Sequence, residues 1–371
     1  MTAPVPSPTP APTLPPSLLA VAQAPAPTPT GGWLLQTLRM TRWTLYLAWR
    51  RVMGKVLLGV LLGLFVLVVS VIILIYFTIA NASVSGGSSC APTPTTPVST
   101  AQPSSNGSST FVCQAPTPAE AQQAQAAQQQ AADQFRDTLL LFPGSLEVAA
   151  TYTSYLGVLL LAILAGALVG GEYGFTVLRL SVSRGVTRAQ HFIGQAAAMG
   201  IISLIISAGM LLLGALIGVT IGPLLGGSLL APSPRGIVEL LGYWLALALN
   251  LFAYATLAQS FATLTKSTAG GIGISLAYVI VETVATGLLT TIGLALTVIG
   301  NTSGPFLQHI PDWFMGNALG ALRQYAGAYP YSLAVGTAPM TLAQALLVPV
   351  GYCAVLLGGA YLVFRRRDIT E

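Results

Sequence analysis

The feature that most constrains this chain is Val56–Ala80, a run of 25 residues without a single charged side chain. The hydrocarbon core of a bilayer is about 30 Å thick, so a helix needs roughly 20 apolar residues to cross it. Five further apolar runs lie at about 150–170, 193–219, 236–262, 268–290 and 341–364. The sequence therefore predicts an all-α membrane protein with six transmembrane helices.

The composition excludes a soluble globular protein. Apolar residues make up 54% of the chain and charged residues only 7%, against roughly 25% charged residues in an average soluble domain. The net charge of +5 does not indicate a nucleic-acid-binding protein, because the basic residues are not gathered into a patch with interleaved aromatic side chains. They lie at the ends of the apolar runs, where membrane proteins carry them.

Lysine and arginine positions predict the orientation, because cytoplasmic segments of membrane proteins carry the excess of positive charge. With the N-terminus in the cytoplasm, 12 of the 15 basic residues fall inside and three fall outside. The inside residues are Arg39, Arg42, Arg50, Arg51, Lys55, Arg179, Arg184, Arg188, Lys266, Arg365, Arg366 and Arg367, and the outside residues are Arg136, Arg235 and Arg323. The sequence thus predicts a multi-pass protein of the plasma membrane with both termini in the cytoplasm.

The first 55 residues divide into two parts. Residues 1–32 alternate proline with Ala, Thr and Ser, a composition that cannot form a packed core and that predicts a disordered tail. At 33–55, apolar and aromatic residues recur at near-helical spacing with basic residues among them. This pattern predicts an amphipathic helix at the inner membrane interface. The alternative, an upstream extension of the 56–80 span, is disfavoured by the five cations in the segment.

Residues 81–149 form the predicted extracellular insertion between the first and second transmembrane helices. The start of this loop is rich in Ser, Thr, Pro and Gly, whereas Thr117-Pro118-Ala119-Glu120 has the cap, proline and acid that begin a helix. We expect a helix at about 118–141, and a solvated spacer is the alternative that its Ala/Gln-rich composition leaves open. Cys90 and Cys113 share the loop, where a disulfide would persist; a pair of free thiols is the alternative.

The remaining residues, 150–371, form the predicted membrane core of five helices. Between the fifth and sixth spans, about 291–340, the chain is apolar in places but interrupted by glycine and proline, so each piece is too short to cross the bilayer. Short or re-entrant helices at the outer face are expected there. Two glycine pairs, Gly59-x-x-x-Gly63 and Gly166-x-x-x-Gly170, would allow close helix packing.

The sequence lacks the motifs of an enzyme. It has no G-x-x-x-x-G-K-[ST] phosphate loop and no H-E-x-x-H motif. Its two histidines, His191 and His309, fall on opposite sides of the predicted membrane, which argues against a metal site or a Ser-His-Asp triad. We therefore expect no enzymatic activity and no metal or other cofactor in this chain.

One acidic residue falls inside a predicted span. A charged carboxylate there costs about 2.5 kcal/mol or more, so Glu282 should face protein or a cavity. It is a candidate residue of a translocation path, with Asn250 and Gln259 of the fourth span as possible partners. A structural hydrogen bond between neighbouring helices is the alternative for all three.

A charged segment closes the second span and forms the first cytoplasmic loop. Its pattern is carried by Gly171, Glu172, Thr176, Leu178, Ser183, Arg184 and Arg188. These residues resemble the signature of ABC-2 type transporter permeases, although Phe175 stands where that family carries a glycine and Thr187 replaces a serine. The ending Phe364-Arg365-Arg366-Arg367-Asp368-Ile369 is similar to the C-terminal pattern of the same family.

The resemblance implies a transport subunit, with ATP and magnesium bound by a separate ABC ATP-binding subunit. The loop between the second and third spans would be a coupling helix, and Glu172, Arg179, Arg184 and Arg188 would transmit the motion of the ATPase. A second permease copy, identical or different, would complete the path, and export is the expected direction. The alternative for the arginines is a topogenic charge cluster that satisfies the positive-inside rule.

A second functional hypothesis remains beside the transporter. The chain would then be a membrane-anchored assembly or sensor protein that acts through the loop at 81–149, although half of that loop is low-complexity. The few ionisable groups in the spans favour a lipid-like or amphipathic cargo over a small hydrophilic ion if the chain is a permease.

Overall fold

The computed structural model describes residues 32–82, 118–174, 186–224, 234–300, 303–326 and 340–366. These residues form helices, and no strand occurs among them. The elements are α2 (Trp33–Arg50), α3 (Val52–Ala82), α4 (Pro118–Leu139), α5 (Gly144–Tyr152), the π-helix η1 (Thr153–Gly157), α6 (Val158–Gly174), α8 (Arg188–Leu224), α9 (Pro234–Thr265), α10 (Thr268–Val298), α11 (Gly304–His309), the 3-10 helix η2 (Ile310–Trp313), α12 (Met315–Ala326) and α13 (Leu342–Arg366).

Six helical stretches in the described residues are long and apolar enough to cross a membrane. They are Val52–Ala80, Gly144–Tyr173, Arg188–Leu224, Ile237–Thr265, Thr268–Val298 and Leu342–Arg366. The prediction of an all-α protein with six candidate spans is therefore confirmed. The second stretch begins at Gly144, before the expected boundary at 150, because α5, η1 and α6 follow one another without a break.

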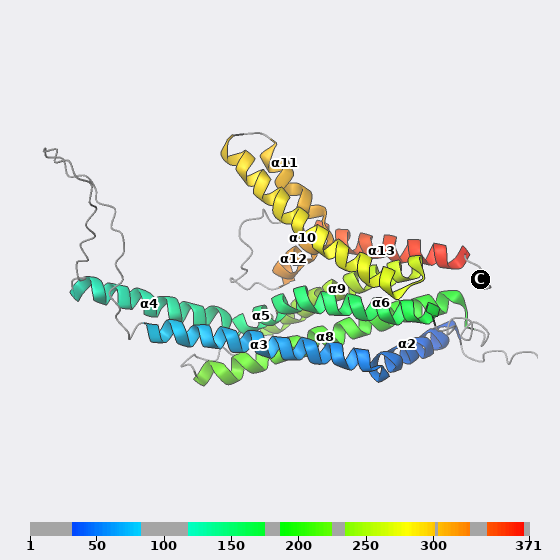
Figure 1. Cartoon of the computed structure of the whole chain (residues 1–371), viewed down its shortest axis with the longest axis horizontal. Coiled ribbons are helices and arrows are strands. Elements are labelled where there is room, and N and C mark those ends of the chain that lie inside the picture. Colours follow the sequence, from blue (N-terminus) through cyan, green and yellow to red (C-terminus); the bar gives the residue numbers. More distant parts are fainter. Residues whose placement is uncertain are drawn as a thin grey trace, which may run out of the picture.

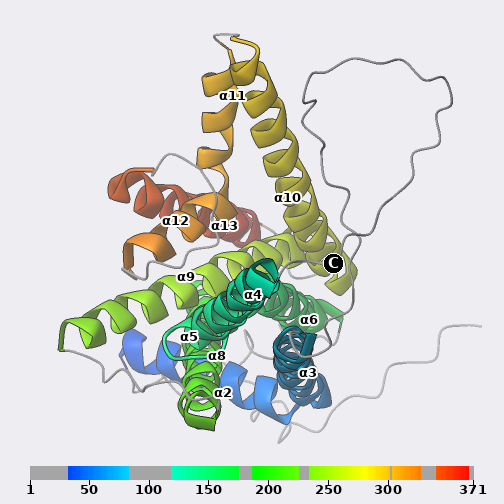
Figure 2. The same cartoon turned by 90° about the vertical axis from the view of Figure 1, so that its left-hand side faces the viewer.

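Helix α9 is the centre of the helix bundle. It contacts α6, α8, α10, α12 and α13, and it crosses the middle of the molecule when viewed from one end (Figure 2). The largest core cluster is built where α6 and α9 meet, with Leu161 and Ala165 on one side and Leu251 and Ala258 on the other. Small residues alternate with leucine on both faces, which lets the two helices approach closely.

The two glycine pairs have different surroundings. A Cβ atom added at Gly170 would lie 2.5 Å from the backbone nitrogen of Thr268, and one added at Gly166 would lie 2.8 Å from Ile272, so this pair packs against the start of α10. A Cβ added at Gly59 or Gly63 would meet nothing within 4 Å. Among the described residues, only the second pair therefore serves helix packing.

Helix α10 extends from the bundle together with α11, and the two form a projecting pair (Figures 1 and 2). In the most apolar stretch of α10 only 11% of the residues are buried. The helix continues to Val298, two turns beyond the expected end at 290. The interval 291–340, where short helices were expected, contains the last residues of α10 followed by α11, η2 and α12.

The first described helix, α2, ends at Arg50 because Arg51 has an extended backbone (φ −68°, ψ 130°). The helix expected at 33–55 is therefore divided between α2 and α3. Its buried face consists of Thr37, Thr41, Thr44 and Ala48. Each threonine hydroxyl donates to the backbone carbonyl four residues earlier. This small face packs on α8, while large apolar side chains such as Trp43 and Trp49 stay exposed.

Helix α4 occupies the stretch where the sequence favoured a helix at about 118–141. It contacts α3 and α5 and lies at the opposite end of the molecule from α2 (Figure 1). Near its end, Arg136 forms ion pairs with Asp133 (3.1 Å) and Asp137 (2.9 Å). Burial lowers the pKa of the Arg136 guanidinium, but the hydrogen bond to Asp137 and the two carboxylate charges raise it by more, so its pKa lies above the ordinary value.

Candidate functional site

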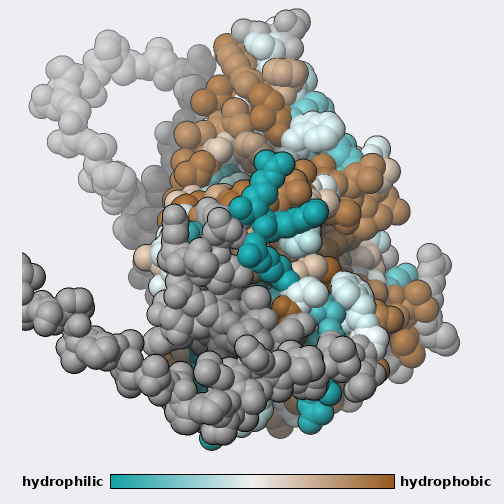
Figure 3. Space-filling model, turned by 90° about the vertical axis from the view of Figure 1, so that its right-hand side faces the viewer, coloured by the Kyte–Doolittle hydropathy of each residue, from teal (hydrophilic) through white to brown (hydrophobic). Residues whose placement is uncertain are grey.

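The predicted coupling residues lie at or beside the end of α6. Glu172 is in the last turn of α6 and Arg188 is the first residue of α8. Arg179 and Arg184 fall between these helices, outside the described residues. The end of the molecule that carries the end of α13 and α2 has hydrophilic side chains near the centre of its face, with hydrophobic surface on both sides (Figure 3).

Glu172 is the centre of a buried polar cluster. The residue as a whole is 5% exposed. The Oε2 atom lies 2.9 Å from His191 Nε2 and accepts a hydrogen bond of 2.6 Å from Gln195 Nε2. His191 and Gln195 are one turn apart on α8, so a single carboxylate joins α6 to α8. Burying a carboxylate is costly unless it is hydrogen-bonded, and these two side chains meet that requirement.

The histidine ring is bonded on one side only. His191 Nδ1 is buried and has no hydrogen-bond partner among the described residues. The other ring nitrogen, Nε2, contacts Glu172 Oε2 and lies 3.2 Å from Gln195 Nε2, so both polar contacts of the ring are on the Glu172 side.

Helix α8 begins with a reciprocal cap. The backbone N–H of Thr187 donates to Gln190 Oε1 (3.0 Å), and the backbone N–H of Gln190 donates to Thr187 Oγ1 (3.3 Å). This is the capping-box arrangement, which satisfies two backbone donors at a helix start. The Gln190 amide also donates to Gln36 Oε1 of α2 (2.8 Å), so α2 is tied to the same place.

Arg188 connects the start of α8 to the end of α13. Its Nη1 atom donates to the backbone carbonyl of Arg365 (3.0 Å), which lies in the last turn of α13. A cation is favourable there because the last carbonyls of a helix are unsatisfied and carry partial negative charge. Beside this contact, Phe192 packs on Tyr361 and Phe364.

Glu282 forms a second buried node midway along α10. Its Oε2 atom accepts a hydrogen bond from the Tyr254 hydroxyl (2.7 Å), and its Oε1 atom accepts one from the backbone N–H of Gly316 (2.6 Å). Gly316 is in the first turn of α12. A carboxylate at a helix N-terminus satisfies an orphan N–H and interacts favourably with the helix dipole. Glu282 thereby joins α9, α10 and α12.

The structure does not bring the predicted trio of Glu282, Asn250 and Gln259 together through hydrogen bonds within its described part. Asn250 is buried and lies one turn before Tyr254 on α9. Both polar atoms of the Gln259 amide are buried without a hydrogen-bond partner among the described residues. Only Glu282 therefore belongs to a connected site.

A third polar group, which the sequence did not single out, lies around α5 and η1. Glu147 accepts hydrogen bonds from Thr151 Oγ1 (3.2 Å) and from the Tyr243 hydroxyl of α9. Arg323 of α12 donates to the carbonyl of Ala150 (3.3 Å) and to the Ser154 hydroxyl. The sequence did not indicate a role for Glu147, because residues 81–149 were predicted to form the extracellular loop.

The cysteines and possible metal ligands give no further site. Cys90 and Cys113 lie outside the described residues. Cys353 is a buried thiol of α13 that accepts a hydrogen bond from Thr256 Oγ1 (3.6 Å). Among the residues that the structure describes, no group of three His, Cys, Asp or Glu side chains is arranged to hold a metal ion.

Comparison with known proteins assigns this architecture to a family. A family model described as "Protein of unknown function (DUF2705)" matches residues 132–370, well over half of the chain. The chain belongs to the DUF2705 family. The DUF2705 match begins near the end of α4 and includes both carboxylate nodes, but it excludes α2 and α3. No curated protein and no solved structure matches the chain.

Proposed function

We propose that this DUF2705 protein is the permease subunit of an ABC-2 type transporter. Two permease copies, identical or different, form the membrane path, and a separate ABC ATP-binding subunit binds ATP with magnesium and drives transport, with export as the direction. The signature residues between Gly171 and Arg188 are the reason for choosing this family of transporters.

The observation that carries the proposal is the anchoring of both ends of the 175–185 segment. Before it, Glu172 is bonded to His191 and Gln195 of α8. After it, Arg188 is bonded to the last turn of α13, and the adjoining Gln190 is bonded to α2. A force applied between these two anchored ends would be transmitted to α6, α8, α13 and α2 together. A coupling element requires such a connection. Arg179 and Arg184 supply positive charge for an acidic surface of the ATPase.

The proposal also fixes the orientation of the molecule in the membrane. The end with α2, Glu172 and the C-terminus of α13 is cytoplasmic, and α4 is extracellular. Exposed aromatic side chains such as Trp43 and Trp49, together with exposed Arg39 and Arg42, support a place for α2 at the inner interface. With Lys and Arg concentrated at the α2 end, this orientation follows the positive-inside rule.

Within the membrane, we propose that the helices joined by Glu282 move together during transport. Glu282 links α10, of which little is buried, to α12 and to the central helix α9. A displacement of α10 therefore carries the N-terminus of α12 with it. We assign a lipid-like or amphipathic cargo, because the candidate spans contain few ionisable groups.

The first test is whether an ATPase with a phosphate loop is encoded beside this gene. A candidate found there is then co-purified with the chain, and ATP hydrolysis is measured in the complex. Arg184→Glu should lower the amount of bound ATPase about tenfold or more, since like charges placed across an interface cost several kcal/mol. Glu172→Leu should retain the bound ATPase but lose the stimulation of its activity by the permease.

The matched control is Arg42→Gln, which removes an exposed cation at the same end of the molecule but outside the loop. It should leave both readouts unchanged. Unaltered ATPase binding and stimulation in both Arg184→Glu and Glu172→Leu would refute the coupling assignment.

A further inference from the structure

An apolar pocket lies beside α5, away from both carboxylate nodes. It has a volume of about 410 Å³ and is bounded by Val68 of α3, Leu139 of α4 and a stripe of side chains that runs from α5 through η1 into α6. Leu156 and Leu159 form its apolar end within the span. The volume lies in the range of about 300–1,000 Å³ that is usual for small-molecule sites.

One charged group lines the pocket, the carboxylate of Glu147. Two neutral hydroxyls hold it in place, from Thr151 on the same helix and from Tyr243 of α9. Within the described part of the chain, no Lys, Arg or His forms an ion pair with it. Arg323, which bonds to the same stretch of α5 and η1, is directed to Ala150 and Ser154 instead. Among the described residues, the negative charge of Glu147 is thus oriented but not neutralised by a cation.

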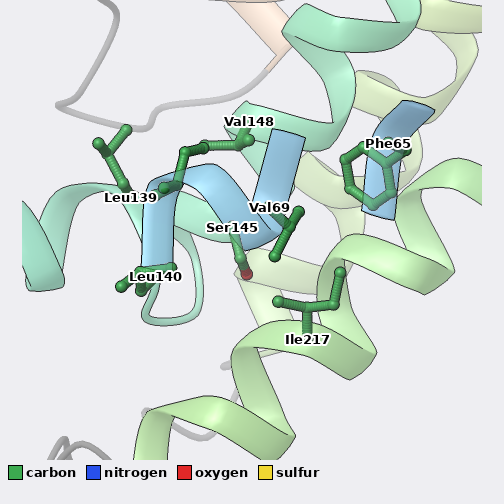
Figure 4. Close-up of a pocket in the computed structure, with 8 residues that line it drawn as sticks. Phe65, Val69, Leu139, Leu140, Ser145, Val148 and Ile217 are labelled. Atoms are coloured by element: carbon green, nitrogen blue, oxygen red, sulfur yellow. The ribbon is translucent and has the colours of Figure 1, made fainter. Parts of the chain in front are cut away.

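The neighbouring cavity on the other side of Val148 does not extend this site. It encloses only about 10 Å³ between α3, α5 and α8, which is at most the space of one water molecule. Figure 4 shows the hydroxyl of Ser145 near Val69 and Ile217, which line the same cavity. The small cavity therefore adds no ligand-sized space to the larger pocket.

We propose that the pocket binds an amphiphile with one apolar chain and a cationic head group. The chain lies along Val68, Leu156 and Leu159, and the cation pairs with Glu147. Apolar walls with a few well-placed polar groups are the usual composition of a ligand site. A carboxylate that faces such a pocket without a cation of its own selects a positively charged head over a neutral or anionic one. The inference concerns binding by this chain alone and goes beyond the proposed transport function.

The test is photolabelling of the purified full-length chain in phosphatidylcholine nanodiscs. Three probes share a photoreactive twelve-carbon chain and carry a trimethylammonium, a hydroxyl or a sulfate head group. The cationic probe should saturate at the lowest concentration, and its adducts should map by mass spectrometry to residues 144–159 and to the neighbourhood of Val68.

Two variants test separately the negative charge of Glu147 and the volume of the pocket. Glu147→Gln keeps the shape and should raise the half-saturating concentration of the cationic probe about tenfold or more, while leaving that of the hydroxyl probe unchanged. Val68→Trp fills the pocket and should weaken both probes. Glu239→Gln removes a carboxylate of α9 that does not line the pocket and should change neither.

Equal labelling by the cationic and hydroxyl probes in the unaltered chain would overturn the proposal and leave a general site for apolar chains. Adducts outside the pocket, or an unchanged affinity of Glu147→Gln for the cation, would overturn it as well. If Glu147→Gln does not fold, the head-group preference of the unaltered chain and the Val68→Trp variant still decide the outcome.

Discussion

The Glu172 cluster at one end of the bundle and the Glu282 node midway along α10 both bury a carboxylate between helices, but their partners differ. Glu172 accepts hydrogen bonds from two side chains of α8. Glu282 accepts one from a side chain and one from the backbone N–H of Gly316. Side chains can change rotamer when their partner moves, whereas a backbone donor moves only with its helix. The first node can therefore adjust locally, and the second couples whole helices.

The largest expected effect is the loss of the Glu282 carboxylate. Glu282→Ala leaves a buried tyrosine hydroxyl and a partly buried helix N–H without an acceptor, which should lower the free energy of unfolding by about 2–5 kcal/mol. Glu172→Ala should cost less, about 1–3 kcal/mol, because His191 and Gln195 can turn to other partners. Unfolding of both variants in mixed micelles, titrated with dodecyl sulfate, compares the two values. A smaller cost at Glu282 than at Glu172 would contradict the distinction between the nodes.

A smaller effect should follow from adding one methyl group at the Glu282 node. A Cβ at Gly316 would lie 2.8 Å from the Tyr254 hydroxyl and 3.3 Å from Glu282 Oε1. Gly316→Ala should therefore destabilise the chain by about 1–3 kcal/mol through overpacking. Tyr254→Phe removes the hydroxyl that the methyl group meets, so the double variant should lose less than the sum of the two single variants.

The control for this prediction lies one turn further along α12. A Cβ at Gly320 would meet nothing within 4 Å, so Gly320→Ala should be neutral or stabilising by up to about 1 kcal/mol. Equal destabilisation at the two glycines would show that the helix, and not the carboxylate node, limits the space.

The smallest effect is expected when one donor of the Glu172 cluster is removed. Gln195→Leu leaves Glu172 with His191 as its partner and should cost about 1 kcal/mol in the same unfolding assay. An exposed glutamine of α4 serves as the control, since Gln123→Leu should change the free energy of unfolding by no more than about 0.5 kcal/mol. A loss at Gln195 as large as at Glu282 would mean that the Glu172 cluster is as rigid as the deeper node.

Several features of the site could be read from the sequence because they depend on neighbours in the chain. Thr187 and Gln190 have the spacing of a capping box, and the structure contains that box. Glu172 could be identified as a candidate because it is an acidic residue at the end of a span. Its partners could not be found in the same way, since His191 and Gln195 lie on another helix and their approach depends on how α6 packs against α8.

Other features were misjudged or missed for physical reasons. Glu147 was assigned to a loop because the continuous run of apolar residues begins only near residue 150. The helix starts earlier because hydroxyl groups of α5 and α9 donate hydrogen bonds to the Glu147 carboxylate. Asn250 and Gln259 were grouped with Glu282 by polarity alone. On α9 only Tyr254 reaches that carboxylate within the described residues.

The sequence by itself determined the helical class and the six candidate spans, because the length of an apolar run and the scarcity of charge are local properties that the bilayer thickness converts directly into helices. The tertiary structure decided which polar residues form sites. Gly166 and Gly170 pack while Gly59 and Gly63 do not, and Glu282 finds the N-terminus of α12. These outcomes depend on which faces of distant helices meet, and periodicity along one helix carries no information about the face of another.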